Sequence, residues 1–289
     1  MPAVSSKRRP PVRAENTAYT LENLLYLMAR LRNPDTGCPW DVEQDFQSIV
    51  PHTLEETYEV VDAIERGDFS HLREELGDLL FQVVFYSQLA KEQELFDFDE
   101  IIDQLTAKLL RRHPHVFPEG TLHSERASAC TPAEAAIRST WEQAKAKDRF
   151  DKGEFERLAD IPLALPALSR ALKLQKRAAN HGFDWPDYRP VLDKIDEELA
   201  ELREAIDFND AQHVDEELGD LIFACVNLGR HRGIDLEACL RRANLKFATR
   251  FRAMEVIADN NSLDFEALSL AEKNELWLQV KSMEKTSVS

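Results

Sequence analysis

The sequence has little glycine, few cysteines and no long apolar run. Only nine of its 289 residues are glycine, and clusters of β-branched residues are rare, which favours helices. No apolar stretch approaches the roughly 20 residues that span a bilayer, so we expect no membrane partner. The four cysteines lack C-x-x-C spacing, which argues against structural zinc and a disulfide framework. We therefore expect reduced thiols and a cytoplasmic location.

Positive charge is also scarce. Lys and Arg number 36 against 53 Asp and Glu, so the formal net charge is −17. This balance argues against duplex nucleic acid as a partner. It still allows a polyanionic small molecule whose charge is neutralised by metal ions and a few local cations. Residues 1–18 are basic, with Lys7, Arg8 and Arg9, but lack the apolar core of a secretory signal, and we expect a disordered tail.

Two acidic patterns with the same spacing occupy the two halves of the chain. The first comprises Glu55, Glu56, Glu59, Glu75 and Asp78, and the second comprises Glu197, Glu198, Glu201, Glu217 and Asp220. One offset relates them, since 197 − 55, 201 − 59, 217 − 75 and 220 − 78 all equal 142. The duplication predicts an N-terminal domain over 19–150, a linker over 151–162 and a C-terminal domain over 163–284.

Apolar residues at helical spacing predict an all-α fold of two tandem repeated domains. Helices are expected at 19–32, 53–66, 70–94 and 99–112, and then at 166–179, 190–207, 211–232, 236–258 and 268–281. Ser70 is the expected N-cap of the third helix, and residues 38–41 are expected to form a loop. Each domain should be a bundle of four to five helices. Apolar stripes, for example around Leu80 and Val83, predict that the bundles dimerise.

The acidic patterns should converge on paired helices. Residues three or four apart share a helix face, so Glu198 and Glu201 point the same way, as do residues 217 and 220 on the next helix. A short link makes these two helices antiparallel neighbours. Carboxylates this close repel one another unless a cation lies among them. Hard oxygen ligands suit Mg²⁺ and also Mn²⁺.

Two other interpretations of the acids are weaker. An isolated E-x-x-E is ordinarily solvated surface, but here the pattern is duplicated and separate from the apolar face. Ferritin-like di-iron bundles need Glu-x-x-His, which neither copy has. Gly77 and Gly219 hold equivalent positions inside helices, although glycine there costs about 1 kcal/mol relative to alanine. We expect another backbone or a ligand to approach closely at both.

Cations follow the acids in each half. In the second half Lys246 and Arg250 lie four residues apart, and Trp277 precedes Lys281 by the same spacing. The first half has Lys108, Arg112, Trp141 and Lys145 in the same order. Taken alone, a Lys/Arg pair is ordinarily surface and a tryptophan is ordinarily core. Because both pairs recur in the same order in each half, we expect them to form a binding site for a triphosphate, in which the tryptophan stacks on a base or closes the pocket.

The E-E-x-x-E and E-x-x-D patterns resemble those of the MazG-type nucleoside triphosphate pyrophosphohydrolases, all-α enzymes related to the all-α dUTPases. The resemblance extends to residues 54–59, 74–80, 111–117 and 182–185, and it covers nearly all of the chain outside the tail. It implies Mg²⁺-dependent cleavage of an NTP or dNTP to the monophosphate and pyrophosphate by a helical dimer. It also implies metal ligands at Glu198, Glu201, Glu217 and Asp220, phosphate contacts from Lys194, Lys246 and Arg250, and an active-site lining of Trp277 and Lys281.

The general base remains open at this point. Glu197 or Glu198 could orient or deprotonate a water that attacks the α-phosphorus, and Lys281 could instead take part in proton transfer. Lys194 lies one turn before Glu198, whereas its counterpart in the first half is His52, which is mostly neutral at pH 7. We therefore predict weaker or absent turnover in the first half.

Two competing functions also stay open. The chain could be a non-catalytic helical scaffold that is stabilised by metal and binds a regulatory partner, or its hydrolysis could be restricted to one nucleotide. His113 and His115 flank Pro114, and we interpret them as a helix-ending loop. The remaining histidines show no spacing typical of metal ligands.

Overall fold

The computed structural model describes residues 18–126, 161–287 and a few positions between them. The chain divides into two units, 1–146 and 147–289, and each contains five described helices. No strand occurs in the described ranges, so the all-α prediction is confirmed. None of the described helices is long and apolar enough to cross a membrane. The expected tail and linker lie almost entirely outside the described residues, and the predicted domain bounds stay predictions.

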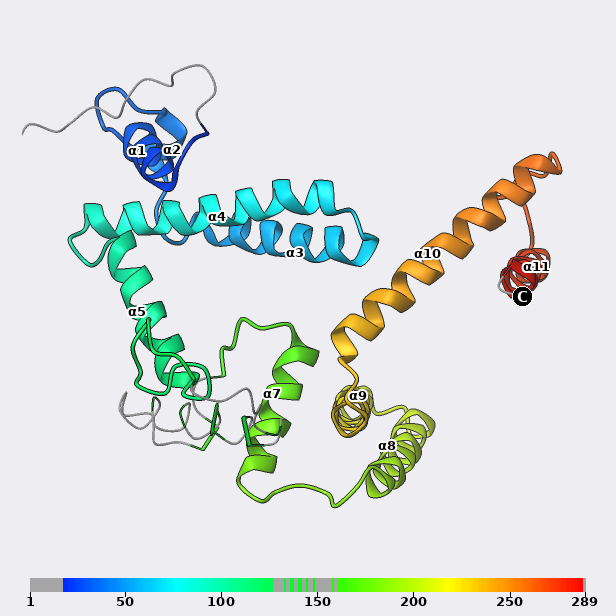
Figure 1. The fold of residues 1–289 in the computed structure, drawn as a ribbon. Helices are drawn as coiled ribbons and strands as arrows, with labels where there is room; N and C mark the ends of the chain where they lie inside the picture. The colour runs from blue at the N-terminus through cyan, green and yellow to red at the C-terminus, as the bar shows by residue number, and fades with distance from the viewer. Residues whose placement is uncertain are drawn as a thin grey trace, which may run out of the picture. The chain divides into compact units, whose positions relative to one another are not determined.

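The first unit is built around an antiparallel pair of helices. Its elements are α1 (Leu21–Leu31), α2 (Pro39–Glu43), α3 (Val50–Arg66), α4 (Phe69–Glu92) and α5 (Phe98–Arg112). Helices α3 and α4 run side by side (Figure 1), because Gly67 adopts a left-handed conformation (φ 71°) and ends α3. Helix α1 packs against α4. The core there consists of Met28, Ile49, Val84, Phe85 and Leu89.

Two local predictions for this unit are wrong. The N-cap of α4 is Asp68 and not Ser70, because the Asp68 carboxylate accepts hydrogen bonds from the backbone N–H groups of Ser70 and His71. The segment expected to be a loop at 38–41 instead enters the short helix α2. Pro39 begins that helix, where its fixed φ is favourable, and Asp41 lies in the first turn.

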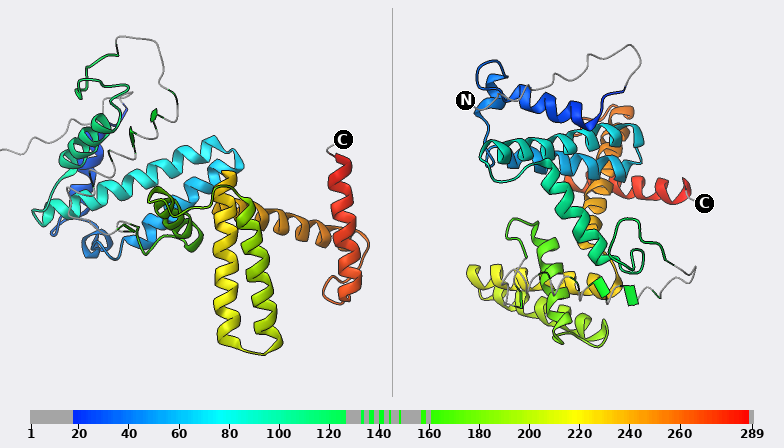
Figure 2. Two further views of the ribbon diagram at one scale, coloured as in Figure 1. Left: turned by 90° about the horizontal axis from the view of Figure 1, so that it is seen from below. Right: turned by 60° about the vertical axis from the view of Figure 1, so that its left-hand side comes forward.

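The second unit repeats the antiparallel pair. Its elements are α7 (Ala167–Asn180), α8 (Arg189–Asp207), α9 (Ala211–Arg232), α10 (Leu236–Asn260) and α11 (Leu270–Ser287). Helices α8 and α9 form a hairpin (Figure 2), and α7 packs against α9. Helix α10 leads away from the hairpin and packs against α11 (Figure 1). A separate core lies between α10 and α11, formed by Met254, Ala258, Leu276 and Val280.

Candidate metal and nucleotide site

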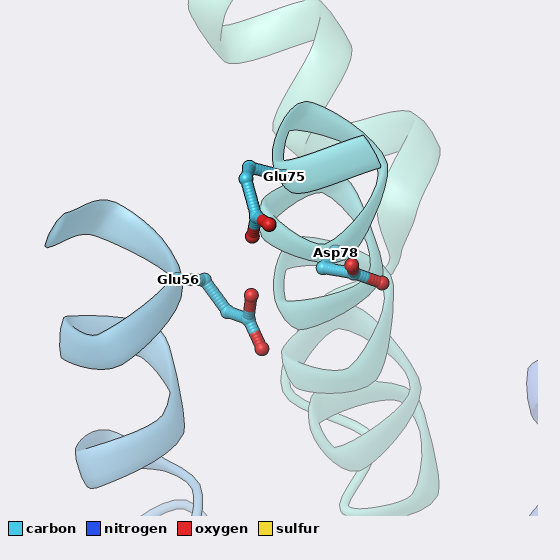
Figure 3. Close-up of side chains that lie close together, drawn as sticks. All are labelled: Glu56, Glu75 and Asp78. Atoms are coloured by element: carbon cyan, nitrogen blue, oxygen red, sulfur yellow. The ribbon is translucent and has the colours of Figure 1, made fainter. Parts of the chain in front are cut away.

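Helices α3 and α4 bring together three acids of the first pattern. Ligand atoms of Glu56, Glu75 and Asp78 all lie within 4.8 Å of one another. Figure 3 shows Glu56 on α3 facing the other two on α4. Burial and then the charge of Asp78 raise the pKa of Glu56, and burial and then the charge of Glu59 raise the pKa of Glu75. The acids therefore crowd one another at the first hairpin. Glu55 lies outside this group.

Helices α8 and α9 form the corresponding group from Glu198, Glu201 and Glu217, whose ligand atoms also lie within 4.8 Å of one another. Glu198 is buried, and burial followed by the charge of Glu217 raises the pKa of Glu201. We call the two sets the first and second acid groups. They share two equivalent positions and differ in the third. Asp220 belongs to neither group, so its role as a ligand stays a prediction.

A fixed cation lies against the second acid group. The Lys194 ammonium is 2.7 Å from a carboxylate oxygen of Glu197 and 2.7 Å from one of Glu198. Hydrogen bonds to these two glutamates raise the pKa of Lys194, so it stays charged. In the first unit His52 takes this place. Its Nδ1 lies 3.7 Å from Glu55, which is not in the first acid group.

One histidine lies beside each acid group, and neither histidine was predicted to belong to the site. Nε2 of His71 lies 3.1 Å from a carboxylate oxygen of Glu75, and Nε2 of His213 lies 2.8 Å from one of Glu217. Each histidine precedes its glutamate by one turn. The sequence contains a signal for these two histidines, because 213 − 71 equals 142, the offset that relates the two acidic patterns.

Two of the three residues expected to bind phosphate, Lys246 and Arg250, lie on α10, and the expected active-site residues Trp277 and Lys281 lie on α11, whereas Lys194 lies on α8. Arg250 forms a 2.6 Å ion pair with Glu284, and its guanidinium carbon lies 5.5 Å from the centre of the Trp277 ring. A hydrogen bond from Arg250 and the charges of Lys246 and Lys281 lower the pKa of Glu284. Glu284 is thus an anion among the predicted phosphate ligands, and no sequence pattern had indicated it. We call Lys246, Arg250 and Lys281 the cationic group. Within one chain, the cationic group lies on α10 and α11, whereas the second acid group lies on α8 and α9 (Figure 1).

The matching residues of the first unit lie at the end of α5 and beyond it. The Trp141 ring lies 5.7 Å from the ring of His113, which directly follows α5. The interpretation of His113 and His115 as part of a helix-ending loop is confirmed. Lys108 and Arg112 lie on α5, while Lys145 is outside the described residues.

The helical glycines beside the acids face open space. A Cβ atom added at Gly77 or Gly219 would meet nothing within 4 Å. In the described part of the chain no other backbone approaches these glycines, so the expectation that another backbone or a ligand does so is not met within the chain and stays a prediction for a ligand. This face has room for a ligand or a second copy of the chain.

The acid groups suit a hard divalent cation. Each offers carboxylate oxygens from two antiparallel helices, which is the donor type that Mg²⁺ and Mn²⁺ prefer. The raised pKa values of Glu56, Glu75 and Glu201 reflect burial and mutual repulsion. A bound cation would relieve that repulsion.

Comparison with known proteins agrees with this chemistry. The sequence profile of the MazG nucleotide pyrophosphohydrolase domain matches the chain twice, at residues 44–117 and 188–254. A nucleoside triphosphate pyrophosphohydrolase of Escherichia coli is 50% identical over 268 residues, which cover 91% of this chain and 98% of that protein. A nucleoside triphosphate pyrophosphohydrolase/pyrophosphatase of Thermotoga maritima is 39% identical over 265 residues, 92% of this chain and 97% of that protein.

Proposed function

The chain belongs to the MazG nucleotide pyrophosphohydrolase family, and on that basis we propose that it hydrolyses nucleoside triphosphates to the monophosphate and pyrophosphate. We further propose that the reaction requires Mg²⁺, for which Mn²⁺ can substitute, and that the second unit performs most of it. The observation that carries this proposal is the second acid group with Lys194 at 2.7 Å from Glu198. A cytoplasmic nucleotide pool would supply such substrates.

The acids divide into ligands and a candidate base. Glu198, Glu201 and Glu217, with Asp220 as a fourth donor, would hold the ion, which supplies Lewis-acid polarisation of the phosphoryl oxygens. Glu197 lies outside the group and faces Lys194. It is our first candidate to accept the proton of the water that attacks the α-phosphorus, and Glu198 is the alternative base. Lys281 could instead take part in proton transfer.

The cationic group would neutralise the leaving pyrophosphate. Arg250 and Lys246 offer positive charge, and Trp277 lies beside Arg250 with a ring face that can stack on a base. Nε and Nη2 of Arg250 pair with Glu284, so a phosphate oxygen would either bind through Nη1 or displace that carboxylate.

A homodimer would complete the site. Leu218 and Ile222 on α9 are both 46% exposed, and the equivalent Leu76 and Leu80 on α4 are also exposed. A two-helix hairpin with an exposed apolar face can bury that face by pairing with a second copy. Such pairing would allow the cationic group of one copy to meet the acid group of its partner.

Mixing two inactive variants tests this shared site. Glu198→Gln removes an acid and Arg250→Ala removes a cation, and each variant alone should release little pyrophosphate. After co-refolding, half of the dimers contain both chains and each has one intact site, so about a quarter of the original activity should return. No recovery would argue against a site shared between copies.

Product analysis tests the reaction itself. The protein is incubated with a panel of NTPs and dNTPs, with Mg²⁺ and with EDTA, and the products are separated. We expect equal amounts of monophosphate and pyrophosphate with Mg²⁺ and none with EDTA. Glu201→Ala and Asp220→Ala should abolish release while the circular dichroism spectrum is unchanged. A folded protein that binds metal but cleaves nothing would favour the scaffold alternative, and cleavage of a single nucleotide would indicate restricted specificity.

A further inference from the structure

The second helix of each acidic hairpin begins with the same chain of contacts. Asp68 caps α4 and accepts a 3.0 Å hydrogen bond from the backbone N–H of His71. Asp210 caps α9 and accepts a 3.1 Å hydrogen bond from the backbone N–H of His213. In both helices the histidine ring then reaches the glutamate one turn further on. The same atoms, Nε2 and Oε1, make both contacts.

We propose that His71 and His213 are positioning residues for the metal site. Each would donate a hydrogen bond from Nε2 to the glutamate of its acid group, Glu75 or Glu217, and so hold that carboxylate toward the acids of the neighbouring helix. The inference rests on the proposed function, because it assumes that the acid groups bind a divalent cation. It adds residues that neither the acidic pattern nor the family resemblance had indicated.

A comparison within the chain separates these contacts from ordinary surface pairs. Two other histidine–glutamate contacts, His52 with Glu55 and His71 with Glu74, measure 3.7 and 3.9 Å and involve glutamate side chains that are 64% and 66% exposed. In contrast, the side chains of Glu75 and Glu217 are only 8% and 13% exposed. The shorter contacts therefore join a half-exposed imidazole to a largely covered carboxylate.

The physical effect of such a contact is to order the ligand before the ion binds. A glutamate side chain loses rotamer freedom when it is fixed, so a carboxylate that is already held binds with a smaller entropic cost. A carboxylate has two oxygens, and one can accept from the histidine while the other stays available to a cation. Hydrogen-bond partners of metal ligands commonly affect metal affinity in this way.

Direct Mn²⁺ binding to the full chain tests the proposal without relying on turnover. The parent protein carries Glu56→Gln and Glu75→Gln, so that the second acid group is titrated alone, and free Mn²⁺ is measured by electron paramagnetic resonance at the same pH for every variant. His213→Ala should weaken Mn²⁺ binding about tenfold, the lower end of the range for partners of metal ligands.

Two further variants control this result. His213→Gln should retain most of the affinity, because glutamine already donates to a glutamate four residues on at 2.8 Å (Gln88 to Glu92) and 3.0 Å (Gln212 to Glu216). Gln212→Ala removes the hydrogen bond from Gln212 to Glu216. Glu216 lies next to Glu217 on α9 but does not belong to the second acid group. This control should leave Mn²⁺ binding unchanged, and thermal unfolding should show that all variants fold.

The outcomes separate this proposal from the function on which it rests. Parent-like Mn²⁺ binding by His213→Ala would overturn the positioning role and leave the metal site intact. Equal losses in His213→Ala and His213→Gln would also overturn it, because hydrogen-bond donation would then not be the relevant property. A parent protein that binds no Mn²⁺ would contradict the proposed function itself. His71→Ala, measured with Glu198→Gln and Glu217→Gln, repeats the test on the first acid group.

Discussion

The hairpins α3–α4 and α8–α9 each bring three carboxylates together, but they differ in the cation beside those carboxylates. In the second unit Lys194 contacts the buried Glu198, a member of the acid group. In the first unit His52 contacts Glu55, which is exposed and outside the group. Convergent carboxylates are thus common to both units, whereas a permanent positive charge beside them distinguishes the second. Our proposal that the second unit performs most of the turnover rests on this difference, because the acids repel a triphosphate and a nearby cation offsets that repulsion.

The acid groups also differ in their third member. Asp78 joins the first group from α4, whereas Glu201 joins the second from α8. Two positions, 56 with 198 and 75 with 217, are common to both. If the two units have different roles, substitutions at the common positions should separate those roles most clearly.

The largest effect is expected from the matched pair Glu198→Gln and Glu56→Gln in the full chain. Partners of metal ligands affect activity about 10- to 100-fold, so loss of the ligand Glu198 should lower pyrophosphate release about 100-fold or more. Glu56→Gln should leave release nearly unchanged. Steady-state assays with dNTPs measure both, and equal losses would show that the two units contribute alike.

Exchange of the cations should have a smaller effect. Lys194→His gives the second unit the residue of the first, and we expect kcat/KM to fall about tenfold, as for loss of a hydrogen bond to a charged group. His52→Lys, combined with Glu198→Gln, should restore measurable activity to the first unit if the cation is what that unit lacks. No gain would show that the first unit differs in more than this cation.

The glycines offer a third comparison. Because both face open space, Gly77→Ala and Gly219→Ala should each favour the helix by about 1 kcal/mol. We expect Gly219→Ala also to raise KM for the nucleotide, since its face lies beside the proposed active acids, whereas Gly77→Ala should not. Thermal unfolding and steady-state kinetics measure the two effects. An unchanged KM in both would indicate that no substrate approaches Gly219.

The smallest effect concerns the stability of the metal-free protein. The pKa of Glu56 is raised above its ordinary value of 4.5, so the folded state binds the proton more tightly than the unfolded state. The protonated Glu56 therefore contributes to the free energy of unfolding at low pH, and this contribution is lost as the pH rises from about 4.5 through the pKa of Glu56 in the folded state. Metal-free Glu56→Gln should unfold at a higher temperature than the parent at pH 7 but not below pH 4. Added Mg²⁺ should reduce the difference.

A second substitution sharpens this comparison. The pKa of Glu201 is also raised, but the charge of Lys194 opposes the shift. Glu201→Gln should therefore stabilise the metal-free protein less than Glu56→Gln does. An equal or larger gain would show that Lys194 does not offset the repulsion within the second acid group.

Periodicity was sufficient to predict the long helices, but not the short helix α2 or every contact at the helix ends. The helix predicted over 211–232 has those bounds in the structure, because its apolar face and its flanking Asp210 and Gly233 agree. The Asp68 cap was missed because Ser70 is also a good N-cap residue, and only the backbone geometry distinguishes the two.

The site was predictable to a similar extent. Spacing on a helix placed Glu198 and Glu201 on one face, and the short link brought Glu217 to them. The pairing of Arg250 with Glu284 was not predictable, because it joins two helices that are separated by a turn and no periodic pattern relates their faces. The histidines at 71 and 213 could have been found by applying the 142-residue offset to all residue types.

We propose that the second acid group directs water to the α-phosphorus of a nucleoside triphosphate. The most direct test of this proposal is a single turnover in water enriched in heavy oxygen, with full-length protein that carries Glu56→Gln and Glu75→Gln. We expect the labelled oxygen to appear in the monophosphate at the rate of the unmodified protein. Label in the pyrophosphate, or no turnover by this variant, would contradict it.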